Sequence, residues 1–108
     1  MTGVTKGTSI TVKCRLLEPS GRPIVTAKGN LLVQDKGTNG LATPPATPAY
    51  SGTNVFRVSD DGDFSGDDGF YTYTLSTSGT PFLRGHYFLV TATWNDGSTT
   101  KGWIYIKP

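Results

Sequence analysis

The chain has few of the residues that catalysis, disulfide bonding or zinc binding require. Its 108 residues include one cysteine, Cys14, and one histidine, His86. A single cysteine excludes an intramolecular disulfide, and therefore a small secreted protein held together by disulfides. One cysteine and one histidine, far apart in the sequence, are also too few ligands for a zinc site.

No set of residues indicates an enzyme. His86 follows Gly85 at the start of an apolar run, where we expect it to be exposed to solvent, and no nucleophile motif accompanies it. The only glutamate, Glu18, lies in a turn-rich segment. A phosphate-binding glycine loop leads into a helix, and the sequence shows no helical periodicity, so we expect no such phosphate site. We therefore predict a protein without enzymatic activity and without an organic cofactor.

Long apolar runs are also missing. No stretch reaches the roughly 18 apolar residues of a membrane-spanning helix, so we expect no membrane insertion. The N-terminal residues MTGVTKGTS lack the apolar core of a signal peptide. Two explanations fit these observations: a module taken from a larger exported protein, or a whole small protein that is not exported through a signal peptide, such as a virion component.

Charge is unevenly distributed along the chain. Five of the eight acidic residues fall in one short segment, which leaves three acidic against ten basic residues elsewhere. The five are Asp60, Asp61, Asp63, Asp67 and Asp68. Because the basic residues are scattered and are not clustered with stacking aromatics, we expect a solvated surface and no nucleic-acid partner.

What the sequence does contain is a series of short strands. Its last third has three runs of β-branched and aromatic residues, at 70–77, 86–94 and 99–107. The segment 95–98, Asn-Asp-Gly-Ser, lies between the last two runs and is a strong hairpin signal. The chain should therefore end in an antiparallel meander.

Earlier segments show similar patterns. Residues 8–17 alternate between apolar and polar, which predicts a strand with Cys14 as a small hydrophobic residue on its buried face. Further strands are predicted at about 25–34 and 53–58. Between them, the proline-rich segment 43–48 should be extended, crossing between sheets or lying along an edge. Together these elements predict one all-β domain, a two-sheet sandwich of about seven strands, with a small barrel as the competing architecture.

The last two strands look apolar on both faces. One face of the first of these strands carries Phe88, Val90, Ala92 and Trp94. The other face carries Tyr87 and Leu89, and the final strand adds Trp103 and Tyr105. If these four side chains are exposed, they form a candidate contact surface for a protein partner or for self-assembly. Alternatively, the long proline-containing loop packs over them.

The acidic segment also contains a weak calcium motif. Asp61, Asp63 and Ser65, followed by Gly66, match the opening of a calcium-binding loop, in which alternate oxygen ligands surround one hard cation. Thr72 takes the place of the usual bidentate glutamate, so Asp67 or Asp68 would have to complete the site. The alternative is a loop tip whose Asp and Gly residues form turns.

Five segments of the chain follow one another in a characteristic order. The first two are 6–16, KGTSITVKCRL, and 20–24, SGRPI. Downstream come 52–57, GTNVFR, then 71–77, YTYTLST, with the pattern Y-x-Y-x-L-S-T, and then 96–98, DGS. This series resembles the PxKF family of bacterial Ig-like domains: the segments are similar, in order, to its opening strand, the turn that follows, the segment before the central turn, a later strand and the closing hairpin. The resemblance covers nearly the whole chain.

The resemblance implies an Ig-like antiparallel β-sandwich without enzymatic activity, used as a spacer, adhesion or assembly module on an extracellular or cell surface. It transfers no binding residue. A second expectation is a virion protein that decorates a phage capsid or tail. A third is a carbohydrate-binding module that presents Trp or Tyr to a polysaccharide.

Overall fold

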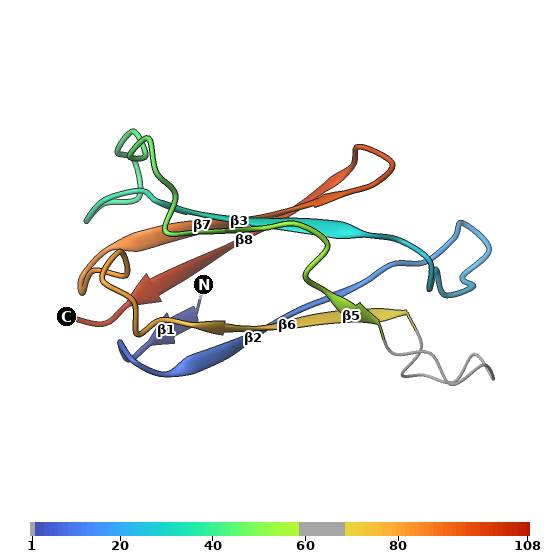
Figure 1. The fold of residues 1–108 in the computed structure, drawn as a ribbon, viewed down its shortest axis with the longest axis horizontal. Helices are drawn as coiled ribbons and strands as arrows, with labels where there is room; N and C mark the ends of the chain where they lie inside the picture. The colour runs from blue at the N-terminus through green and yellow to red at the C-terminus, as the bar shows by residue number, and fades with distance from the viewer. Residues whose placement is uncertain (1, 59–68) are drawn as a thin grey trace.

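The computed structural model describes residues 2–58 and 69–108, which form two facing sheets (Figure 1). The five-stranded sheet has the order β1-β8-β7-β3-β4 and the three-stranded sheet the order β2-β6-β5. The bounds are β1 Thr2–Val4, β2 Ser9–Arg15, β3 Gly29–Asp35, β4 Tyr50–Gly52, β5 Arg57–Val58, β6 Phe70–Ser76, β7 Tyr87–Trp94 and β8 Thr99–Ile106. The all-β class is confirmed, and the described residues form eight strands where about seven were predicted for the chain. These two ranges contain no apolar helix of membrane-spanning length.

The three C-terminal strands form where the alternation predicts them, but the predicted meander is wrong for the first of them. β7 pairs antiparallel with both β3 and β8, whereas β6 pairs antiparallel with β2 in the other sheet. The hairpin between β7 and β8 is closed by Asp96, whose Oδ1 accepts hydrogen bonds from the N–H (2.9 Å) and Oγ (2.6 Å) of Ser98. These bonds hold the pKa of Asp96 below its usual range.

Aromatic side chains join the two sheets at the end near this hairpin. The ring of Trp94, from β7, lies 5.1 Å from that of Tyr71, from β6, in an edge-on contact, and 5.1 Å from that of Phe56. Trp94 also covers the backbone of its strand partner Gly29, where an added Cβ would lie 2.5 Å from Cζ3 of the indole. Close packing of Trp94 therefore requires a glycine at position 29.

The strand predicted at 25–34 begins only at Gly29. The reason is Tyr71, which is almost fully buried. Its hydroxyl donates to the carbonyl of Ile24 (2.8 Å) and accepts from the N–H of Ala27 (3.0 Å). Backbone groups that bond to a side chain in this way are not available to a strand ladder. The residues before Gly29 therefore run as a connection rather than as a strand.

The strand predicted at 53–58 forms only at its last two residues, as β5 in the three-stranded sheet. β4, in the five-stranded sheet, ends at Gly52, before the predicted range begins. Asn54 lies between them with a φ of 52°, and its N–H donates to Oδ1 of Asn30 (3.0 Å). This left-handed residue breaks the strand. The chain thus crosses between the sheets after β4, and not within the proline-rich segment.

Substitution of the two glycines at 29 and 102 should have opposite consequences. Gly29→Ala places a methyl group against Trp94 and Phe56, so we expect a loss of about 1–3 kcal/mol in the free energy of unfolding. An added Cβ at Gly102, which is also in a strand, meets no atom within 4 Å. Gly102→Ala should therefore change stability by less than about 0.5 kcal/mol. Chemical denaturation measures both, and equal losses would contradict this account of Gly29.

A second contact joins the sheets at Tyr50 of β4 and Tyr73 of β6. Their rings stack with centroids 5.3 Å apart. The side-chain hydrogen bond to Tyr73, together with burial, raises the pKa of Tyr50 to about 12. Because the unfolded value is about 10, the contact stabilises the fold fully below that pH. The stabilisation is lost as the pH rises through about 12.

Removal of the Tyr73 hydroxyl should reverse most of this shift. In Tyr73→Phe the neutral Tyr50 phenol loses its hydrogen-bond partner, so we expect its pKa to move down toward about 10. Nuclear magnetic resonance of ring-labelled tyrosine resolves the titration of each residue. Tyr87→Phe, on the other face of the sheet, is the matched control. A Tyr50 titration unchanged in Tyr73→Phe would show that the hydrogen bond is not the cause.

Candidate interaction surface

The four predicted contact residues lie together on the outer face of the five-stranded sheet. Tyr87 of β7 is directly opposite Tyr105 of β8, and Leu89 is opposite Trp103. The residues that alternate with them, among them Phe88 and Ile104, are buried between the sheets. Since neighbouring residues of a strand point to opposite faces, these four point outward. We call them the outer aromatic face.

This face is only partly open. Trp103 is 38% exposed, and the other three side chains are half-buried. The rings of Tyr87 and Tyr105 pack together with centroids 4.6 Å apart. The connection between β3 and β4 covers part of the face at Gly40, where an added Cβ would lie 3.7 Å from Tyr87 and 3.9 Å from Trp103. The predicted loop covering therefore occurs in part, at a position ahead of the prolines.

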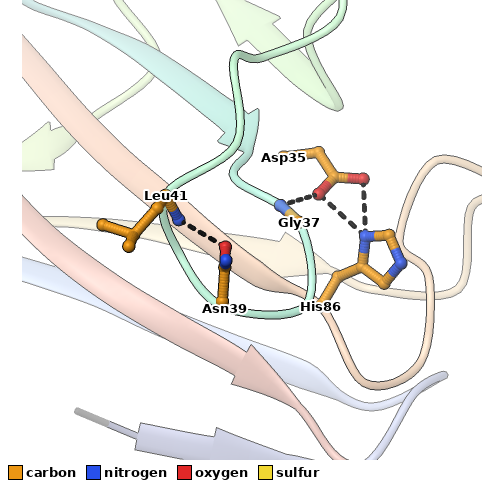
Figure 2. Close-up of polar contacts among 5 residues, drawn as sticks. All are labelled: Asp35, Gly37, Asn39, Leu41 and His86. Carbon is orange, nitrogen blue, oxygen red and sulfur yellow. Dashed lines mark hydrogen bonds and ion pairs between the residues drawn. The ribbon is translucent and has the colours of Figure 1, made fainter.

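A set of hydrogen bonds holds this part of the connection, residues 36–42, which we call the covering loop. Nδ1 of His86 donates to both carboxylate oxygens of Asp35 (2.9 and 3.0 Å), and the same carboxylate accepts from the N–H of Gly37 (2.8 Å; Figure 2). The backbone of Tyr87 adds two bonds, donating to Gly37 O and accepting from Lys36 N, each 2.8 Å. The base of the loop is thus an extension of the β3–β7 ladder.

His86 differs from its prediction as a solvent-exposed residue. Its side chain is 25% exposed and the Asp35 side chain 13%, and the two form an ion pair when the imidazole is protonated. Burial follows because β7 and β3 pair up to this point, which brings His86 beside the residue that ends β3. The sequence gives no signal for this contact, since Asp35 lies 51 positions away.

The covering loop presents an apolar side chain that the sequence pattern does not identify. Leu41 is 82% exposed, the largest fraction among the exposed large hydrophobic residues of the described chain. Its N–H donates to Oδ1 of Asn39 (2.9 Å), and both residues lie on the opposite side of the loop from the Asp35–His86 pair (Figure 2). The N–H of Ala42 closes the loop on the carbonyl of Lys36 (3.0 Å). The side chain of Leu41 is therefore held outward. Its neighbour Gly40 lies close to Tyr87 and Trp103.

The remaining predicted chemistry is not part of this surface. The calcium ligands proposed from the sequence, Asp61, Asp63, Ser65 and Asp67, lie outside the described residues. Within 2–58 and 69–108 no group of three or more His, Cys, Asp or Glu side chains could hold a metal ion.

Cys14, predicted as a small hydrophobic residue on the buried face of its strand, is half-buried. It lines an open gap between β2 and β8. Partial burial raises the pKa of the Cys14 thiol, so the thiolate form is disfavoured.

Comparison of the chain with family models, with characterised proteins and with solved structures returned no match.

Removal of the Asp35 carboxylate should loosen the covering loop. In Asp35→Ala both His86 Nδ1 and the N–H of Gly37 lose their acceptor. We expect the Gly37 amide to exchange with solvent at least tenfold faster and the free energy of unfolding to fall by about 1–3 kcal/mol. Asn39→Ala, which removes only the exposed bond to Leu41, is the control and should leave Gly37 unaffected. Hydrogen exchange followed by nuclear magnetic resonance reports both; an unchanged Gly37 in Asp35→Ala would be contrary to this assignment.

Proposed function

We propose that the protein is a non-catalytic Ig-like module that associates with other proteins through the outer aromatic face and Leu41. The strand order supports the Ig-like part of this proposal. In Ig domains the strands G, F and C are neighbours in one sheet and B, E and D in the other. The orders β8-β7-β3 and β2-β6-β5 correspond to these two sets when the strands are taken in chain order.

The observation that supports an interaction role is that exposed apolar side chains lie on a backbone that hydrogen bonds already hold in place. Leu41 and Trp103 are both exposed. Gly40, the neighbour of Leu41, lies near Trp103, since a Cβ added at Gly40 would be 3.9 Å from the indole ring. Fully burying a Leu side chain contributes about 1.5–3 kcal/mol. Aromatic residues are enriched in the centres of interfaces. Because hydrogen bonds hold the covering loop already, little order has to be gained on binding.

Self-association is the form of this proposal that needs no second component. We expect sedimentation velocity over a range of protein concentrations to show a reversible oligomer. Leu41→Ser combined with Trp103→Ser should weaken association at least tenfold, because both exposed apolar side chains are lost. A tenfold change in affinity corresponds to about 1.4 kcal/mol. Leu17→Ser, at a residue 46% exposed outside this face, is the control and should have no effect. A monomer at every concentration would contradict self-association.

The same exposed Trp103 beside Tyr105 also favours a second candidate, a carbohydrate-binding module. Aromatic rings present a flat apolar surface with a polar edge, which suits stacking on sugars. Isothermal titration calorimetry against a panel of polysaccharides distinguishes the two. Binding heat that Trp103→Ser removes, from a protein that remains monomeric, would favour the carbohydrate module. No heat across the panel would exclude it. An extracellular surface as the place of action remains a prediction from the resemblance, and a virion surface remains a separate prediction from the sequence.

A further inference from the structure

The sandwich is open along one side, between β2 and β8. A groove of about 310 Å³ lies there, at the lower end of the roughly 300–1,000 Å³ of ligand pockets. Its floor is apolar: Val90 and Ala92 from β7 face the half-buried side chains of Ile10, Val12 and Cys14 from β2. An apolar gap of this size between two sheets leaves part of the core accessible from the side.

Gly102 is one reason for the gap. It is directly opposite the buried Val90, so its absent side chain would point inward. An added Cβ at this position meets no atom within 4 Å. The inner face of β8 therefore lacks a side chain at this point beside the groove.

The edge of β8 beside the groove is unpaired in the part of the chain that the structure describes. β1 pairs with β8 only at residues 104–106. The backbone of Ile106 bonds to the β7 side through both its N–H and its carbonyl, and Trp94 N–H bonds to Ser98 O at the other end. Because such groups alternate along a strand, the N–H and C=O of Thr99 and Lys101 point away from β7. They offer hydrogen bonds to a further strand.

We propose that the groove binds an extended segment of a partner protein, which adds to β8 as a parallel strand in line with β1. β1 already uses this edge in the parallel direction, so the added strand continues an existing pairing. Alternate side chains of the segment would enter the groove and cover Ile10, Val12 and Cys14. Peptide binding by strand addition combines backbone hydrogen bonds with side-chain pockets in this way.

The charges at the groove specify the chemistry of the segment. Lys13 and Lys101 are the charged residues among those that line it, and both are positive. Outside the acidic segment 60–68, the chain has ten basic residues and three acidic ones. The partner segment should therefore alternate apolar residues with polar ones that include Asp or Glu, since opposite charges across an interface direct association.

A synthetic ten-residue peptide with valine at alternate positions, and aspartate and threonine between them, is the probe. Without peptide, the amides of Thr99 and Lys101 in the full chain should exchange rapidly with solvent. With peptide they should exchange at least tenfold more slowly, as measured by nuclear magnetic resonance. Lys101→Glu should reverse the preference, so that a peptide with lysine in place of aspartate binds at least tenfold more tightly than the acidic one.

Gly102→Leu fills the groove and should weaken peptide binding at least tenfold. Thr93→Leu, which adds a similar side chain to the outer face of β7, is its matched control and should bind normally. If Gly102→Leu fails to fold, the charge reversal at Lys101 still tests the proposal. At protein concentrations where the chain is monomeric, Leu41→Ser should leave peptide binding unchanged, which separates this proposal from association through the outer aromatic face.

Several results would overturn the proposal. Slow exchange at Thr99 and Lys101 in the free monomer would mean that the edge is already covered. Protection that appears without peptide as the protein concentration rises would identify a second copy as the occupant. Absence of protection with either peptide at millimolar concentration, or protection at the edges of β4 or β5 instead, would exclude strand addition at β8.

Discussion

The pairing register of β7 and β8 is the constraint on which both surfaces of the molecule depend. Val90 opposite Gly102 and Phe88 opposite Ile104 place the apolar set inward, and Tyr87, Tyr105 and Trp103 outward. A slip of β8 by one residue would exchange the two faces of that strand. It would turn Tyr105 inward and expose Ile106, which is fully buried. The hairpin bonds of Asp96 and the contacts of Trp94 fix the register at one end, so a local turn determines the chemistry of the entire sheet.

Two strand glycines show how packing differs between the sides of the sandwich. At Gly29 the indole of Trp94 occupies the space that a side chain would need, and Tyr71 and Phe56 complete a closed aromatic cluster. At Gly102 the same absence of a Cβ leaves open space. Interiors normally pack at the density of organic crystals. The gap beside β8 is therefore a place where an apolar group from outside would complete a core that the described residues leave open.

The parts of the fold that sequence reasoning identifies are those set by local alternation. Residues 70–76, 87–94 and 99–106 repeat with a period of two, and their inward and outward sets follow from it. The start of β3 depends instead on Tyr71, whose hydroxyl takes up the backbone of Ile24 and Ala27 from more than 40 positions away. β1 is too short to show a period. Contacts of this kind are fixed by the tertiary arrangement, and no local pattern encodes them.

The same limit applies to the candidate sites. Periodicity placed Tyr87, Leu89, Trp103 and Tyr105 on one face, because that requires only two strands in a known register. Leu41 lies in an irregular loop, and its exposure results from the hydrogen bonds of Asp35, His86 and Asn39. The groove could be predicted only by knowing which strand faces β8 across the sandwich. This depends on the topology of the fold, which the patterns of individual strands do not determine.

The two surfaces meet on β8, and this makes them dependent on each other. The side chains of Lys101, Trp103 and Tyr105 point to the outer face, while the backbone groups of Lys101 point to the free edge. A strand added at that edge would place its own outward side chains beside Trp103 and enlarge the outer aromatic face. The two kinds of association would therefore affect each other through geometry alone. Binding in the groove would change the area available for contact on the face, without any movement of the sheets.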